Sequence, residues 1–149
     1  MVVTPSAKTT FELVSPERLL LSQAVDMVVV PGAEGLFAAL VGHAPFIAQL
    51  RPGVIDVWDG GRITERIFVG GGFAEVTGER CVVLAETATP VAEIDRARVV
   101  ERLEELKNVA EVARSTGGST EHGILAELEL NQAMLAAVDD KGARRPDSA

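Results

Sequence analysis

The chain has 149 residues and is poor in the side chains that usually carry catalysis or ring stacking. It contains one cysteine, two histidines and no tyrosine, and aromatic residues make up 4% of it. The lone Cys81 cannot form an intramolecular disulfide and has no second thiolate with which to bind a metal. Its position in the apolar run 81–84 predicts a buried strand cysteine. Trp58 is the single tryptophan on which a sugar ring could stack.

Long hydrophobic runs are also missing, although 47% of the residues are hydrophobic. The apolar stretches fall far short of the roughly 18 residues that span a bilayer. Residues 1–10 lack the basic start, apolar stretch and cleavage site of a secretion signal, so we expect no export. The net charge of −8 argues against nucleic acid as a partner, because phosphate binding needs clustered cations. For the same reason we expect no direct lipid insertion.

Catalytic and metal sites are not indicated. The serines lack G-x-S-x-G surroundings, and no glycine-rich loop ends in Gly-Lys-Ser/Thr. His43 and His122 lie in separate parts of the chain, so a metal site of both would require distant segments to meet. Gly70, Gly71 and Gly72 follow a strand but lack the third glycine of G-x-G-x-x-G, which favours a bulge or a close strand approach. We therefore predict a protein without catalytic residues, metal or cofactor.

Residues 9–86 predict short strands separated by turn signals, a pattern typical of an all-β sandwich or barrel. Within 53–58 the side chains alternate, so Val54 and Asp56 lie on the face opposite Ile55 and Val57. The glycines of the turns 59–61 and 77–79 are expected at positive φ. The clearest strands are 22–30, 53–58 and 62–69.

Beyond Thr89 and Pro90 the hydrophobic period changes to that of a helix. Asp95 is the expected N-cap of a first helix, which Gly117 and Gly118 end, and Ser119 or Thr120 caps a second helix. Two helices joined by a short loop indicate an antiparallel hairpin. The first apolar stripe is Val99, Leu103, Leu106, Ala110 and Ala113, and the second is Ile124, Leu128, Leu135 and Val138.

The predicted fold class is α+β. An N-terminal antiparallel β-sandwich of about ten strands is expected over residues 9–88, followed by a two-helix antiparallel hairpin over 93–138. The tail 139–149 contains Pro146 and mixed charges without periodicity, and we expect it to be disordered.

Six short motifs, in order and spacing, resemble one family: the epsilon subunit of F-type ATP synthases, equivalent to the mitochondrial delta subunit. The resemblance runs from about Phe11 to Val138. The motifs are FELVSPE (11–17), PGAEG (31–35), GHAP (42–45), LRPG (50–53), VGGGF (69–73) and VLAETA (83–88).

The resemblance implies a non-catalytic central-stalk subunit of the rotor, a peripheral membrane protein on the cytoplasmic face of the bacterial inner membrane. Its sandwich would meet the gamma subunit along one edge and the membrane rotor ring of c subunits at one end, coupling the ring to the catalytic head during ATP synthesis. The ring contacts would come from two loops expected at that same end. A loop histidine with satisfied polar atoms is the alternative interpretation of His43. The contact residues would be Glu34, Gly35, Gly42, His43, Ala44 and Pro45.

The hairpin departs from two further uses that the family makes of it. The ATP-sensing motif is matched at Ile94, Asp95 and Arg98, the weak ATP-binding candidates of this chain, but Val99 replaces its alanine. The inhibitory use, through contact with the alpha and beta subunits of the catalytic head, calls for a basic second helix. Residues 121–138 contain three glutamates and no lysine or arginine. We therefore expect weak or absent inhibition of ATP hydrolysis and weak ATP binding.

An alternative to nucleotide binding by the arginines of the first helix is the formation of ion pairs within that helix. Arg96, Arg98 and Arg102 can pair within the helix with Glu93, Glu101 or Glu105 instead of binding a nucleotide.

A different class of function is a small-molecule-binding sandwich in which Trp58 stacks on a sugar. With 4% aromatics the chain offers no stacking platform beyond that tryptophan, which argues against this alternative. A metal-dependent enzyme of barrel type is disfavoured by the histidine count.

Overall fold

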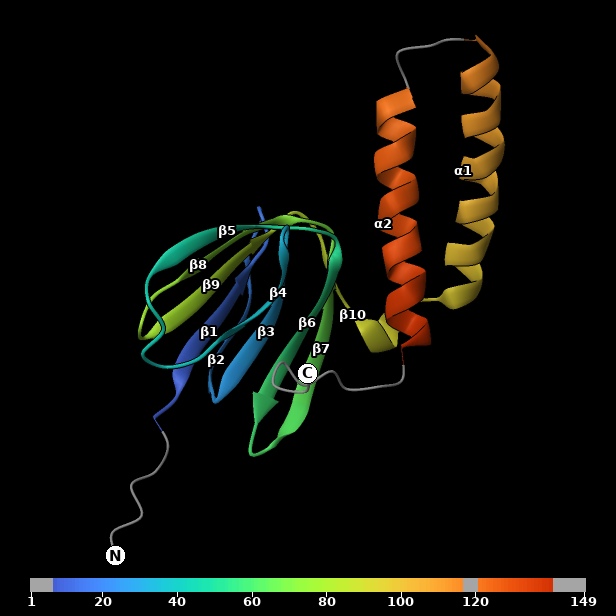
Figure 1. Ribbon diagram of the computed structural model, residues 1–149. Helices are drawn as coiled ribbons and strands as arrows, with labels where there is room; N and C mark the ends of the chain where they lie inside the picture. The colour runs from blue at the N-terminus through green and yellow to red at the C-terminus, as the bar shows by residue number, and fades with distance from the viewer. Residues whose placement is uncertain (1–6, 117–120, 141–149) are drawn as a thin grey trace, which may run out of the picture.

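The computed structural model describes residues 7–116 and 121–140, which form a strand-rich unit followed by two helices (Figure 1). This arrangement confirms the predicted α+β fold class. The strands are β1 (Thr9–Val14), β2 (Leu19–Val25), β3 (Met27–Gly32), β4 (Gly35–Ala39), β5 (Phe46–Leu50), β6 (Gly53–Asp59), β7 (Arg62–Val69), β8 (Gly72–Val76), β9 (Arg80–Ala85) and β10 (Ala88–Pro90). The helices are the 3-10 turn η1 (Val91–Glu93), α1 (Arg96–Thr116) and α2 (Glu121–Asp139).

The strands form two layers that meet at one point. One layer has the order β4-β3-β6-β7-β10, the other β5-β8-β9-β1-β2, and the Gly32–Leu50 pair joins them. Strand pairing is antiparallel except between β1 and β9, which run parallel. Among the described strands, that pair departs from the antiparallel sandwich that the sequence predicts.

The core lies between the two layers. Phe11, Val83 and Val76 come from one layer, and Ile55 and Val69 from the other; each is at most 1% exposed. The alternation predicted for β6 holds, because Ile55 and Val57 belong to this core whereas Asp56 points the other way. Among the residues that the structure describes, none from the helices belongs to this core cluster. The sandwich therefore has a hydrophobic core of its own.

Two local predictions are wrong. The predicted strand 22–30 is not one strand: Asp26 separates β2 from β3, and its Oδ2 accepts a hydrogen bond from Gly60 N–H at 2.9 Å. Gly60 and Gly61 have the expected positive φ of 64° and 79°, but Gly78 does not have a positive φ. The turn at 77–79 is held instead by Thr77, whose hydroxyl accepts hydrogen bonds from Glu79 N–H and Arg80 N–H.

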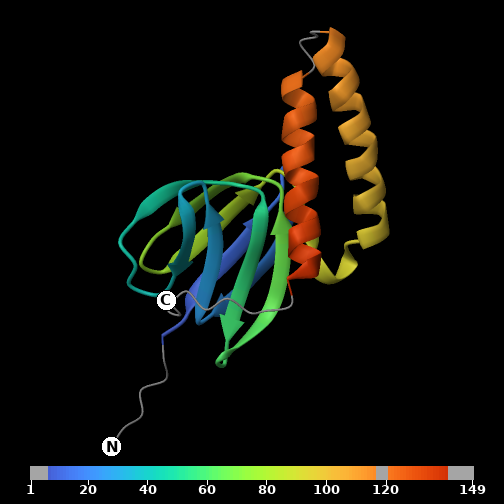
Figure 2. The same cartoon turned by 45° about the vertical axis from the view of Figure 1, so that its right-hand side comes forward.

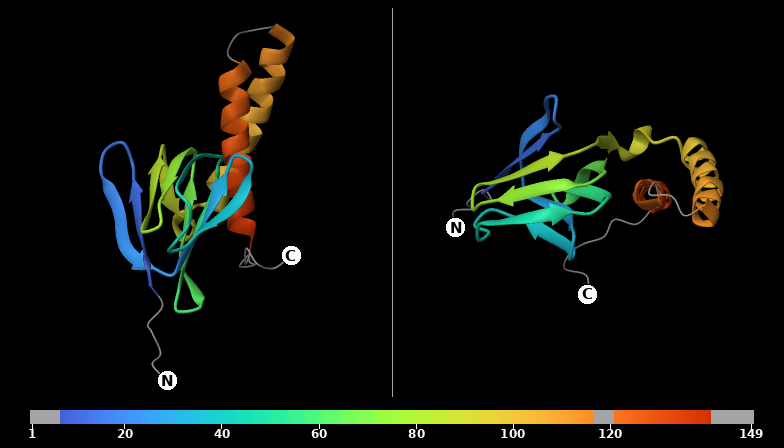
Figure 3. Two further views of the ribbon diagram at one scale, coloured as in Figure 1. Left: turned by 60° about the vertical axis from the view of Figure 1, so that its left-hand side comes forward. Right: turned by 90° about the horizontal axis from the view of Figure 1, so that it is seen from above.

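The two helices form the predicted hairpin beside the sandwich (Figures 1 and 2). Asp95 caps α1, since its Oδ1 accepts hydrogen bonds from Ala97 N–H at 3.1 Å and Arg98 N–H at 3.4 Å. The predicted stripe of α1 is largely buried. α2 lies between the sandwich and α1 when the molecule is seen from above (Figure 3). The proposed caps at 117–120 and most of the tail lie outside the described residues; residue 139 is the last of α2.

The glycine run shows a close strand approach and no phosphate loop. Gly71 and Gly72 have φ of 115° and 132°. A Cβ built on Gly72 would lie 2.0 Å from the carbonyl oxygen of Leu84 on β9, and one on Gly70 would lie 2.3 Å from Thr87 Oγ1. The turn into β8 thus has no room for side chains at these two positions.

This geometry predicts the effect of a methyl group at Gly72. Gly72→Ala adds both an unfavourable φ and a backbone clash, so we expect it to lower the free energy of unfolding by at least about 3 kcal/mol. Gly60→Ala is the matched control: it has a positive φ but open space around it, and should cost only about 1 kcal/mol. Urea unfolding followed by Trp58 fluorescence measures both, and equal losses would contradict the steric argument.

Candidate partner-binding surfaces

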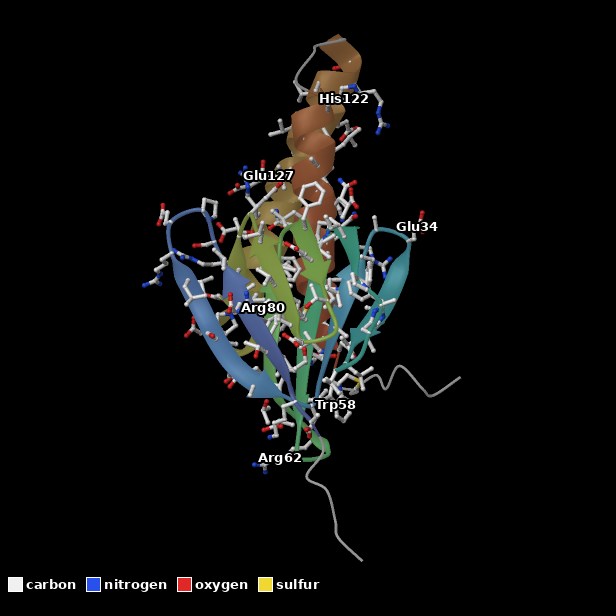
Figure 4. The ribbon with its side chains drawn as sticks, turned by 90° about the vertical axis from the view of Figure 1, so that its left-hand side faces the viewer. Glu34, Trp58, Arg62, Arg80, His122 and Glu127 are labelled. Carbon is white, nitrogen blue, oxygen red and sulfur yellow. The ribbon has the colours of Figure 1, made fainter. Side chains whose placement is uncertain are left out.

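The turn between β3 and β4 presents an exposed carboxylate. Pro31 and Gly32 are buried at its start, whereas Ala33 and Glu34 are exposed at its tip. Ala33 N–H donates to Gln49 O at 2.8 Å, and Gly35 closes the turn with φ of 141°. Figure 4 shows Glu34 at the end of the sandwich nearer the hairpin, opposite Trp58 and Arg62. The hydrogen-bonded turn therefore holds the exposed Glu34 carboxylate in a defined position.

The segment 41–45 is fixed in a different way. Gly42 N–H donates to Gly78 O at 2.7 Å, which ties the segment to the β8–β9 turn. His43 turns back on its own loop: Nδ1 lies 2.8 Å from Ala44 O, and its ring centroid is 4.9 Å from that of Phe46. The half-buried histidine thus resembles the satisfied loop histidine that was the alternative interpretation.

These two segments do not lie at one end of the strands, as the sequence analysis expects. Glu34 and Gly35 precede β4 beside Leu50, whereas Gly42, His43, Ala44 and Pro45 connect the far end of β4 to the start of β5. β5 has five residues, so about 13 Å of strand separates its ends. The expectation of one shared end is wrong because β4 carries the chain from the 33–34 turn to the opposite end of the strands, where the 42–45 segment lies. β5 then brings the chain back, so that Leu50 pairs with Gly32.

The outer face of the β5-β8-β9 layer exposes an apolar patch, which we call the outer patch: Ile47, Phe73 and Leu84. They are 73%, 52% and 53% exposed. Phe73 stands opposite Leu84 in the β8–β9 register, and Ile47 lies on the neighbouring strand β5. Large apolar side chains gathered on a sheet face mark a protein-binding surface.

In the sequence, one apolar group exceeds what the edge of a small sandwich usually exposes: Leu36, Phe37, Leu40, Phe46 and Ile47. That group includes Ile47 of the outer patch but neither Phe73 nor Leu84, although both lie in motifs that carry the resemblance. The available signal was the strand period: Ala74 and Val83 point inward, so their neighbours Phe73 and Leu84 must point outward. Of the other apolar residues noted near this edge, Leu36 and Leu40 are exposed, while Phe37 and Phe46 pack edge to face at 5.0 Å.

The hairpin arginines are engaged mainly across the hairpin. Arg96 Nε donates to Asp139 Oδ1 at 2.8 Å, and Arg102 Nε to Glu127 Oε1 at 2.9 Å. The hydrogen bond to Asp139 raises the pKa of Arg96 further. Of the intrahelical pairs proposed from the sequence, Arg102–Glu105 forms at 3.0 Å.

The ATP-binding candidates lie at the start of α1, where Asp95 has a role in the fold. Asp95 is the N-cap of α1, Ile94 is half-buried before it, and Arg98 is exposed. Residues 91–98 contain no glycine, so no glycine-rich turn lies beside these candidates to bind the phosphates of a nucleotide. The acidic partners of α2 already occupy Arg96 and Arg102.

Other reactive groups offer little chemistry. Cys81 is fully buried, and burial raises the pKa of its thiol to about 12. Trp58 is 8% exposed, so its ring is not open to a stacking sugar. Within residues 7–116 and 121–140, no group of three or more His, Cys, Asp or Glu side chains could hold a metal ion. Neither described helix is long and apolar enough to cross a membrane.

Comparison with known proteins decides the family. A family model described as the ATP synthase delta/epsilon chain, beta-sandwich domain, matches residues 8–91. The ATP synthase epsilon chain of Paramagnetospirillum magneticum is 50% identical over 131 residues, which cover 88% of this chain and 97% of the relative. That of Granulibacter bethesdensis is 47% identical over 134 residues, with 89% and 96% covered. The chain belongs to the ATP synthase epsilon-chain family.

A solved structure agrees with the epsilon-chain fold. A chain from the Euglena gracilis mitochondrial ATP synthase, in a structure titled OSCP/F1/c-ring in rotational state 1, superposes with a TM-score of 0.78. The match covers 91% of this chain and 84% of that chain at 24% identity. It supports the fold of both the sandwich and the hairpin.

Proposed function

We propose that this epsilon-family chain is a non-catalytic rotor subunit that couples the membrane ring of ATP synthase to gamma and the catalytic head. The outer patch carries the proposal: a sandwich with its own core exposes Ile47, Phe73 and Leu84 on a face that the hairpin leaves open. As part of this complex the protein would sit peripherally on the cytoplasmic face of the bacterial inner membrane.

The two kinds of surface suit two kinds of partner. The outer patch suits the apolar side chains of a helical or globular protein, so we assign it to gamma. The exposed carboxylate of Glu34, on its fixed turn with Gly35, suits the polar loops of the rotor ring. Leu40 and Val41 are exposed beside the 42–45 segment, which we therefore move from the ring to the gamma side.

Cysteine crosslinking in the assembled enzyme tests these assignments. We expect Glu34→Cys to crosslink to a ring subunit, Phe73→Cys to gamma, and His43→Cys not to the ring. The native Cys81 does not compete, because it is fully buried and burial raises its pKa to about 12, so it stays a protonated thiol at neutral pH. Crosslinking of residue 34 only to the catalytic head would reject the orientation. Crosslinking of residue 43 to the ring would reject the reassignment.

The acidic second helix predicts weak inhibition of ATP hydrolysis. α2 carries Glu127, Glu129 and Asp139 and no cation in its last turn, so an acidic surface on the catalytic head would repel it. Truncation after residue 90 leaves the sandwich core intact. We expect hydrolysis by the complex to change less than about twofold, under roughly 0.4 kcal/mol. A several-fold rise on truncation would show that the hairpin inhibits.

ATP binding is also expected to be weak. Asp95 is committed to the helix cap, and Arg96 and Arg102 are paired with carboxylates of α2. Calorimetric titration of the isolated protein with Mg-ATP should give a Kd of about 1 mM or weaker. Micromolar affinity, abolished by Arg98→Gln, would establish the site that Ile94, Asp95 and Arg98 suggest.

A further inference from the structure

The C-terminal end of α2 has unfavourable electrostatics of its own. The last turn contains Asp139 and no basic residue, and Asp140 follows it directly. The carbonyl end of a helix carries partial negative charge, so carboxylates there oppose helix formation. Cations placed near this end therefore stabilise the helix.

Two arginines supply positive charge from outside α2. Arg96, at the start of α1, binds Asp139 as described above. Arg66, on β7, donates from Nη1 to the backbone carbonyl oxygen of Asp140 at 3.1 Å, and its Nη2 lies 3.8 Å from Asp140 Oδ2. A side chain that satisfies a terminal carbonyl acts as a C-cap. Here the cap comes from the sandwich, 74 residues away in sequence.

Arg66 is held in position by a buried acid. Asp56 stands opposite Arg66 in the β6–β7 register, and Arg66 Nε donates to Asp56 Oδ1 at 2.9 Å. The Asp56 side chain is 9% exposed, against 24% for Arg66. One guanidinium thus joins a carboxylate of the sheet to the end of a helix, and its planar fork allows both contacts at once.

Close to Arg66 itself, the apolar contact between α2 and the sheet is small. α2 faces β6 with Ala133, Ala136 and Ala137, and a hollow of about 330 Å³ remains between these alanines and the Pro31 and Val54 side. Alanine methyl groups bury little apolar area, so these three residues add little to the free energy that holds the end of α2 on the sheet. The polar contacts of Arg66 are correspondingly important here.

We propose that Arg66 is an inter-domain C-cap that makes the last turn of α2 conditional on docking. While the hairpin lies on the sandwich, Arg66 neutralises the helix end and the turn that closes with Asp140 N–H donating to Ala136 O is stable. When the hairpin leaves the sandwich, that cation is lost and the turn with its two aspartates unwinds. This device belongs to the fold itself and does not depend on which partners the surfaces bind.

Amide hydrogen exchange on the full-length protein at low salt tests the proposal. Arg66→Gln should speed exchange at the amides of Val138, Asp139 and Asp140 by roughly three- to tenfold, the effect of losing one cation at a helix end. Arg62→Gln is the matched control, because it removes the same charge from the exposed start of the same strand. Equal exchange rates at these amides in the two variants would overturn the proposal.

A second comparison separates capping from damage to the sandwich. Arg66→Gln alone leaves Asp56 buried without its cation, which can loosen β6 and β7. The double variant Asp56→Asn/Arg66→Gln removes that burden while the cap stays absent. Exchange at residues 138–140 should remain fast in the double variant. In Asp56→Asn alone it should be close to normal, because the asparagine Oδ1 can still accept the hydrogen bond from Arg66 Nε. A return to parental protection in the double variant would show that Arg66 acts only through the sandwich, contrary to the proposal.

Discussion

The sandwich has two outer faces, and the hairpin covers only one of them. On the covered side, Phe68 and Val29 are almost fully buried although they belong to neither layer's inner face. On the open side, Phe73 and Leu84 remain half exposed. Apolar residues on an open face reduce solubility unless another protein covers them. This asymmetry gives the protein one internal face and one apolar face that remains open to a protein partner.

Much of the fold follows from local patterns in the sequence. The period of two in 53–58, the glycine pair at 60–61 and the Asp95 cap each depend on neighbours within a few residues, and each was predictable. The split of 22–30 at Asp26 was not. The carboxylate there accepts a hydrogen bond from Gly60, 34 residues away, and nothing in the neighbouring residues 22–30 indicates that distant partner.

The candidate site was harder to predict, because it depends on strand direction. The PGAEG and GHAP motifs are close in sequence and both belong to turns, so one shared end was a natural expectation. They lie at opposite ends because the strand β4, which connects them, crosses the sheet from one end to the other. The ion pairs show the same limit: Arg102–Glu105 follows from helical spacing, whereas Arg66–Asp140 joins elements that only tertiary packing brings together.

The acidic residues of α2 have two consequences that act in the same direction. As a free surface, they would weaken attraction to an acidic catalytic head. In the docked hairpin, Glu127 and Asp139 bind arginines of α1, and Asp140 binds an arginine of β7. Extension of the hairpin would therefore break these ion pairs, and the extended helix would be repelled by an acidic surface on the catalytic head. Replacing these carboxylates by cations would remove both the ion pairs and the repulsion. The acidic residues of α2 therefore favour the docked hairpin in both ways.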